Sequence, residues 1–180
     1  WDMNRNMTEV YSTQLPPQAQ GELAHRYILG LYDLLEKITT RYPDILFESC
    51  SGGGGRFDAG MLYYMPQTWT SDNTDALARL NIQYGTSMVY PISTMGSHVS
   101  AVPNHQTHRV TSLAIRGNVA MSGVLGYELD LTKLTAEEKA SIQEQIVFYK
   151  QHRTLFQFGR FIRLTSPFEK NSCAWMFVSK

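Results

Sequence analysis

Two aspartates, Asp2 and Asp72, are the residues of this sequence whose type and placement could carry out chemistry. Each follows a short segment that we expect to be a β-strand, and 70 positions separate them. In a barrel of alternating strands and helices the carboxyl ends of the strands converge on one mouth, so residues far apart in sequence can face each other across a substrate. A carboxylate pair suits glycoside hydrolysis, because one carboxylate attacks the anomeric carbon while the other, initially protonated, gives its proton to the leaving oxygen.

Residues 50–75 concentrate unusual residue types next to the second aspartate. The four consecutive glycines at 52–55 can adopt backbone conformations closed to other residues and let the main chain approach a ligand closely. Each glycine costs conformational entropy when it is ordered, so a purely structural turn rarely uses four. Trp69 could belong to the core, or it could form one wall of a sugar site in which its apolar face meets the sugar ring. We expect this stretch to shape a site.

The acidic residues of this stretch also have simpler structural explanations. An aspartate at a strand end commonly caps the following helix. Asp75 begins a helical segment and is most simply an N-cap, and Asp58, close to Arg56, could form a structural ion pair. On pattern alone, both compete with Asp72 for the acid role.

Other motifs in the chain do not match the usual patterns of metal, phosphate or thiol sites. His98, His105 and His108 share one polar segment, but their spacing is not a zinc pattern and no carboxylate lies between them, so we predict no metal site and expect them to tie down a long loop. No Lys-Ser or Lys-Thr follows the glycine run, so it is not a phosphate loop. Neither a nearby base nor the neighbouring sequence supports Cys50 as a nucleophile.

The composition limits the classes of partner. Sixteen basic and sixteen acidic residues among 180 give a formal net charge of +0, and no basic block could neutralise a phosphate backbone, so we do not expect nucleic acid. No apolar run approaches the roughly 18 residues of a membrane span and no targeting pattern opens the chain, so we expect no membrane partner. Cys50 and Cys173 are too few for a disulfide framework and suit the reduced thiols of a cytoplasmic protein.

The elements that must position these residues alternate between strands and helices. Periodicity and turn residues predict strands that begin at Trp1, Ile45, Thr68, Met88 and Val119. They predict helices over residues 22–42, 75–84, 109–116 and 135–151. This alternation favours parallel βα units with the functional residues on the loops after the strands, as in an α/β barrel.

Two of these helices carry more specific signals. Thr135-Ala-Glu-Glu138 is a capping box, which marks the start of the last predicted helix. The helix from 75 is expected to place Ala76, Leu77, Leu80 and Tyr84 on one side. The chain opens in what reads as the end of a strand and stops where a new sheet would start, so we expect a fragment of a larger protein.

Several long motifs resemble one known family. WDMNR at 1–5, CSGGGGRFDAGMLYYMPQTWTSDNTDA at 50–76, IQYGTS at 82–87 and YPISTMGSHVSAVPNHQTHR at 90–109 resemble, in this order, glycoside hydrolase family thirty-six, the retaining α-galactosidases of bacteria and fungi. The resemblance implies a (β/α)8 TIM barrel, here from about the fourth strand to the eighth over residues 1–158, followed by the start of a C-terminal β domain over 159–180. One departure is Ala59, where the family motif has proline, which affects loop stiffness more than chemistry.

The same resemblance implies roles for individual residues. Asp2 falls on the nucleophile and Asp72 on the acid/base. The residues that it places in substrate binding are Trp1, Asn4, Cys50, Gly53 and Trp69. A family lysine before the tryptophan and paired acidic residues of earlier strands fall outside this sequence. The implied reaction is hydrolysis of terminal α-linked galactose from oligosaccharides such as raffinose and melibiose, without metal or organic cofactor and with the two carboxyl groups about 5–5.5 Å apart.

Alternative functions remain open on the same barrel. One is galactosyl transfer of the raffinose-synthase type, a second is α-N-acetylgalactosaminidase activity, and a third is a sugar-binding remnant without catalysis. The resemblance also implies a homotetramer of the full-length protein. The choice of aglycone depends on loops and domains outside this sequence.

Overall fold

The computed structural model describes residues 2, 4 and 8–179. Within them a four-stranded sheet has the order β1-β2-β3-β4, and every neighbouring pair is parallel. Its strands are β1 (Glu48–Ser49), β2 (Gln67–Trp69), β3 (Met95–Ser100) and β4 (Val124–Glu128). A helix separates each strand from the next, so consecutive strands lie side by side as in the βα units of a TIM barrel.

The described helices accompany this sheet in chain order. They are η1 (Pro17–Glu22), α1 (Leu23–Arg41), α2 (Ala59–Tyr64), α3 (Ala76–Thr86), η2 (Ile92–Thr94), α4 (Leu113–Ala120), η3 (Leu131–Lys133) and α5 (Ala136–Phe158). The capping box at the start of α5 is confirmed, since Thr135 and Glu138 each bond the backbone N–H of the other. α5 is longer than predicted, and α2 was not predicted. No helix among the described residues is long and apolar enough to cross a membrane.

The strand predicted to begin at Met88 is wrong. Residues 88–90 stay attached to the end of α3, because the Met88 N–H donates to the Gly85 carbonyl at 3.1 Å and the Tyr90 N–H donates to that of Thr86 at 3.0 Å. The chain then forms η2, and β3 begins only at Met95. The strand predicted from Ile45 likewise begins later, at Glu48.

The strand predicted to begin at Val119 is also wrong. Val119 lies near the end of α4, which starts later than predicted because the Ser112 side chain caps the N–H of Ile115. The apolar run continues from this helix into β4, so its composition alone does not separate the two elements. The strand predicted at Trp1 falls outside the described residues, apart from Asp2 and Asn4, which are in no described strand.

The inner face of α3 is more polar than predicted. Ala76 and Tyr84 are buried as expected, but Leu77 is 40% exposed. The remaining buried positions of the helix are Arg79 and Gln83, whose polar groups are hydrogen-bonded. The side of α3 that faces the sheet therefore carries hydrogen-bonding side chains in place of the predicted leucines.

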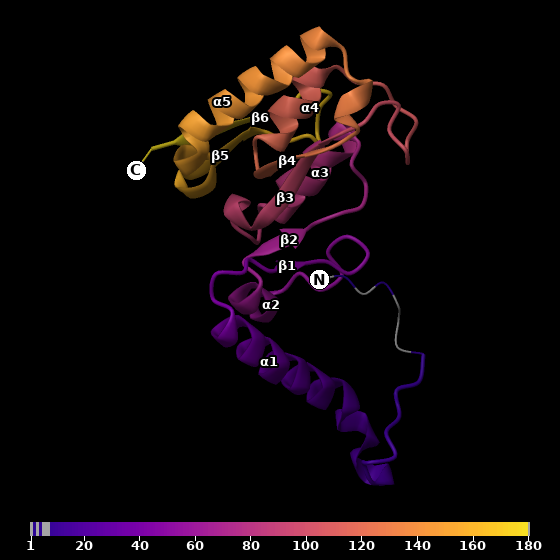
Figure 1. Ribbon diagram of the computed structural model, residues 1–180. Helices are drawn as coiled ribbons and strands as arrows, with labels where there is room; N and C mark the ends of the chain where they lie inside the picture. Colours follow the sequence, from indigo (N-terminus) through magenta and orange to yellow (C-terminus); the bar gives the residue numbers. More distant parts are fainter. Residues whose placement is uncertain (1, 3, 5–7, 180) are drawn as a thin grey trace.

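Two further parts complete the arrangement. Leu35 of α1 packs against Met61 and Met65 in a small core cluster. β5 (Arg160–Thr165) and β6 (Ala174–Val178) form an antiparallel hairpin after α5. Figure 1 shows α1 extending away from the β1 edge of the parallel sheet, whereas α4, α5 and the hairpin gather at the β4 edge.

Candidate active site

The loop after β1 uses its glycines for unusual backbone conformations. Gly52, Gly53 and Gly54 have positive φ angles of 58°, 74° and 93°, a region that other residues rarely adopt. A β-carbon added to Gly53 would lie 2.7 Å from the Cα of Ser71 and would also overlap the backbone nitrogen of Asp72. The glycine loop is therefore packed directly against the main chain that carries Asp72.

The same loop contacts the segment that carries Asp2. The Asn4 side chain donates through Nδ2 to Asp2 Oδ2 at 2.7 Å and accepts through Oδ1 from the Gly52 N–H at 2.5 Å. Asp2 and Asn4 are both exposed, as is Asp72. The structure thus brings Asp2, Asn4 and the glycine loop together, although 48 positions separate Asn4 from Gly52.

Asp72 is oriented by the tryptophan that precedes it. The indole N–H of Trp69, at the end of β2, donates to Asp72 Oδ1 at 3.1 Å. The backbone nitrogen of Asp72 lies against Gly53, in the same glycine loop that Asn4 contacts through Gly52. Asp72 through its backbone and Asp2 through Asn4 are therefore both connected to one glycine loop, although they lie far apart in sequence.

The competing aspartates have structural roles. Asp75 is the N-cap of α3 and accepts from the Ala78 N–H at 3.1 Å, as predicted, and it is also paired with Arg109. Asp58 caps α2 by accepting from the Met61 N–H at 2.8 Å. The predicted partner of Asp58, Arg56, instead donates to the carbonyl oxygen of Cys50 at 3.2 Å.

The other residues predicted for substrate binding include Cys50 and Trp1. Cys50 is half-buried directly after β1, and it and Cys173 are free thiols. Burial raises the pKa of the Cys173 thiol above its usual range. Trp1 lies outside the described residues.

Arg79 is a residue of the site that sequence reasoning missed. It lies on α3 with only 2% of its surface exposed, and its guanidinium donates to the β2–α3 loop on both sides of Asp72. Its central carbon is 4.3 Å from the centre of the Trp69 ring. The sequence signal for Arg79 was its position four residues after the N-cap Asp75, on the side of the helix that is buried.

The predicted histidine loop is partly wrong. His98 belongs to β3, where its ring lies 4.5 Å from the ring of Trp69 and its Nδ1 lies 3.5 Å from Glu128 Oε2. His105 and His108 are exposed. The buried side chain of Asn104 makes the connections that we had expected from histidines, bonding Thr74 Oγ1 at 3.0 Å and the N–H groups of its own loop. The structure shows no group of three metal-ligating residues within residues 2, 4 and 8–179.

Comparison with known proteins assigns the family. The Melibiase family profile matches residues 1–159. The chain belongs to the Melibiase family. The chain is 70% identical over 179 residues to alpha-galactosidase AgaA of Geobacillus stearothermophilus and 65% identical over 179 residues to alpha-galactosidase 1 of Pediococcus pentosaceus. These alignments cover 99% of this chain but 25% and 24% of the relatives, so this chain spans about a quarter of their length.

Solved structures of related α-galactosidases confirm the predicted fold class. A crystal structure of the Geobacillus enzyme superposes with a TM-score of 0.97, covering 99% of this chain and 25% of that one. The galactosidase domain of the bifunctional protein AgaSK superposes with a TM-score of 0.93 at 57% identity, covering 100% of this chain and 24% of the other. The four parallel strands are therefore part of a TIM barrel, and the antiparallel hairpin follows α5 in the chain.

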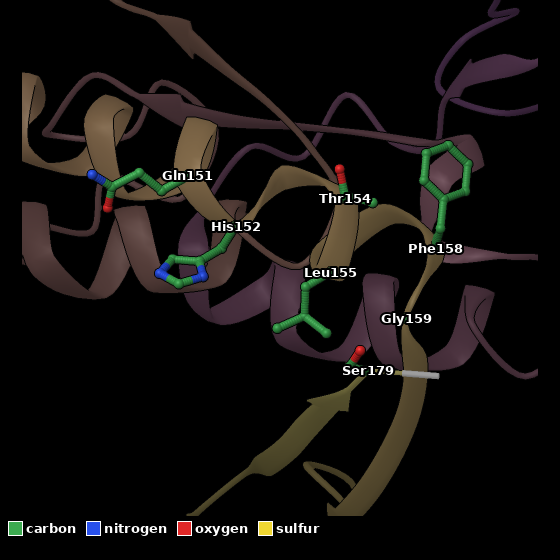
Figure 2. Close-up of a pocket in the computed structure, with 7 residues that line it drawn as sticks. All are labelled: Gln151, His152, Thr154, Leu155, Phe158, Gly159 and Ser179. Carbon is green, nitrogen blue, oxygen red and sulfur yellow. The ribbon is translucent and has the colours of Figure 1, made fainter.

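One hollow of the described residues lies away from these aspartates. A hollow of about 520 Å³ lies between the end of α5 and the end of β6, as Figure 2 shows. It is lined by Gln151, His152, Thr154, Leu155, Phe158, Gly159 and Ser179. None of these is a predicted site residue, and no carboxylate is among them. The candidate active site is the surface around the glycine loop.

Proposed function

We propose that this chain forms part of the catalytic domain of a retaining α-galactosidase, with Asp2 as the nucleophile and Asp72 as the acid/base. The observation that carries the proposal is that both aspartates are connected to one glycine loop, Asp2 through the side chain of Asn4 and Asp72 through its backbone. Asn4 links Asp2 to Gly52, and Gly53 lies against the backbone of Asp72. Two carboxylates that flank one sugar are the minimal machinery for glycoside hydrolysis.

Variants of the Geobacillus relative support these roles. One structure, with an aspartate changed to asparagine, holds raffinose, and another, with an aspartate changed to alanine, holds stachyose; both also carry one alanine-to-glutamate substitution. The two substituted aspartates are 70 positions apart in that enzyme, the same separation as Asp2 and Asp72 here. Removal of a catalytic carboxylate would let an intact oligosaccharide remain bound.

The geometry suggests how each carboxylate acts. In the first step an oxygen of Asp2 attacks the anomeric carbon of a terminal α-galactoside, the bond to the leaving oxygen breaks, and Asp72 protonates that oxygen. In the second step Asp72 takes a proton from water, which attacks the galactosyl ester and releases galactose with its configuration retained. Because the Trp69 N–H donates to Oδ1 of Asp72, the transferred proton is best placed on Oδ2.

The surrounding residues then bind the sugar. Asn4 orients the nucleophile by donating to Oδ2 of Asp2, and the half-buried Trp69 lies beside the acid/base. Gly53 lets the loop approach the ring, with Cys50 at the end of β1 and Trp1 next to the nucleophile as the other proposed contacts. The two-carboxylate mechanism needs no metal or organic cofactor.

The domain boundary and the assembly are part of the same proposal. We infer that residues 1–158 belong to the catalytic barrel and that 159–180 begin a C-terminal β domain. α5 ends at Phe158 with Gly159 as its C-cap, and an antiparallel hairpin follows, which supports this division. For the full-length protein we propose a cytoplasmic homotetramer, to be tested by sedimentation and by fractionation of the source cells.

The stereochemistry of the first product tests the function. The full-length enzyme is incubated with raffinose or melibiose, and the anomeric protons of galactose are followed by NMR before mutarotation. We expect α-galactose to appear first, and initial β-galactose would refute retention. Asp2→Asn should abolish turnover of an aryl α-galactoside, so near-normal turnover would refute its assignment.

The alternatives are separated by substrate. A galactosyl-sucrose product formed with sucrose as acceptor at the expense of free galactose would favour a transferase. Preference for an N-acetylgalactosaminide would favour the second alternative. Tight galactose binding without any turnover would favour a sugar-binding remnant.

A further inference from the structure

Arg79 makes an unusual set of contacts for a helical arginine. Its Nε donates to the Asn73 carbonyl at 3.0 Å, Nη1 donates to Thr70 Oγ1 at 2.7 Å, and Nη2 donates to the Ser71 carbonyl at 2.8 Å. Nη1 also donates to the carbonyl of Gly96 on β3 at 3.3 Å. Three of these acceptors belong to residues 70, 71 and 73, which flank Asp72 on both sides. One guanidinium therefore restrains the loop before and after Asp72.

The guanidinium also holds the indole that orients Asp72. It lies over the Trp69 ring at 4.3 Å, a cation–π distance, and the Trp69 N–H donates to Asp72 Oδ1 at 3.1 Å. The Trp69 ring also contacts that of His98, with the ring centres 4.5 Å apart. The side chain of Asp72 is thereby held through Trp69, while its backbone is held through the loop.

Burial of the Arg79 guanidinium disfavours its charged form. Burial lowers the pKa of Arg79 to about 10, while the nearby carboxylates of Glu128 and Asp72 favour the charged form. A buried arginine is tolerated where its fork of donors is matched by fixed acceptors. Three of the four acceptors of Arg79 belong to the loop that carries Asp72, and the fourth is the Gly96 carbonyl. The buried charge therefore needs this loop conformation, and the loop conformation is stabilised by the buried charge.

From these contacts we infer that Arg79 is the positioning residue of the acid/base: it fixes Asp72 for proton transfer through the 70–73 backbone and through Trp69, without touching substrate. This inference rests on the proposed function, in which Asp72 is the acid/base. It predicts that loss of the guanidinium fork damages proton donation more than sugar binding.

The test compares leaving groups in the full-length enzyme. Values of kcat/KM, which report the glycosylation step, are measured with raffinose, whose leaving group needs a proton, and with 2,4-dinitrophenyl α-galactoside, whose leaving group does not. General acid catalysis contributes about 10²–10⁴-fold. Arg79→Lys keeps a charge but loses the planar fork, so we expect about a 100-fold loss on raffinose and less than about a fivefold loss on the dinitrophenyl substrate.

Two further variants separate positioning from folding. Thr70→Val removes one acceptor of Arg79 at nearly constant volume, and we expect a smaller loss, about tenfold, again confined to raffinose. Arg116→Lys is the matched control, because Arg116 is another buried helical arginine, 5% exposed, which donates to the Ser100 carbonyl. We expect any loss in this control to be equal for the two substrates.

The outcomes distinguish this inference from the function on which it rests. If Asp72→Ala loses activity selectively on raffinose while Arg79→Lys and Thr70→Val lose equally on both substrates, the positioning role is overturned and the proposed function stands. If Asp72→Ala itself loses equally on both substrates, the acid role fails and the inference fails with it. Should Arg79→Lys not fold, the selectivity of Thr70→Val decides.

Discussion

Substitution of Gly53 by alanine tests the contact on which the site depends. Gly53 has a φ of 74°, and a β-carbon there would lie 2.7 Å from the Cα of Ser71 and would overlap the nitrogen of Asp72. Carbon atoms in ordinary contact are about 3.5–4.0 Å apart. Since the clash is with backbone on both sides, the Asp72 loop or the glycine loop must move by about 1 Å.

This displacement sets the expected loss. A misplacement of about 1 Å in a catalytic group can cost about 100-fold in rate, so kcat/KM on raffinose should fall by about that factor. The left-handed backbone conformation adds a cost of about 1–2 kcal/mol to the stability of the variant. The loss of kcat/KM is specific to the contact with the Asp72 loop, whereas the loss of stability follows from the φ angle alone.

Gly52→Ala is the matched control. Gly52 also has a positive φ, 58°, but the nearest atom to its added β-carbon is Asn4 Oδ1 at 3.8 Å, an ordinary contact. The control should lose a similar amount of stability, measured by thermal unfolding, and less than about threefold in kcat/KM. Equal kcat/KM values on raffinose for Gly53→Ala and Gly52→Ala would refute the view that the glycine loop positions Asp72.

Substitutions at three further positions test other contacts in the full-length enzyme. Asn4→Leu removes the donor to Asp2 and should lower kcat/KM about tenfold on raffinose and on the dinitrophenyl substrate alike, because the nucleophile acts on both; unchanged rates would contradict this role. Asp75→Ala should lower the free energy of unfolding by about 1–2 kcal/mol, and Asp75→Asn, which can still cap α3, by less; the reverse order in urea denaturation would argue against capping as its main role. Thr135→Ala should cost about 1 kcal/mol of stability with kcat intact, because its capping box on α5 lies apart from the site residues; a selective loss of kcat would contradict that separation.

Local signals in the sequence predicted several features correctly. The capping box at Thr135 and the N-cap at Asp75 depend on neighbouring residues alone, and both form as predicted. The alternation of strands and helices likewise predicted parallel βα units, because a parallel strand needs a crossover helix. The motifs around Asp2 and Asp72 indicated the family.

Features that depend on tertiary contacts were harder to predict. Met88 and Val119 lie in apolar runs that suit either a strand or a helix end. Turn hydrogen bonds after α3 keep Met88 at the end of that helix, and the Ser112 cap starts the helix that contains Val119. Arg79 was missed because a buried charge is recognisable only when its acceptors are known, and they lie in the β2–α3 loop and on β3. Hydrophobic periodicity favours leucine over arginine at an inner position, so it placed Ala76 and Tyr84 correctly but predicted Leu77 rather than Arg79 to be buried.

The configuration of galactosyl azide tests the central claim, the roles of Asp2 and Asp72, most directly. Azide can replace a missing nucleophile, or it can attack the galactosyl-enzyme when the general base is missing. In full-length variants given an activated α-galactoside and azide, we predict that Asp2→Gly yields β-galactosyl azide, with inversion, and that Asp72→Ala yields α-galactosyl azide, with retention. NMR distinguishes the two products, and the opposite pair of configurations would contradict both assignments.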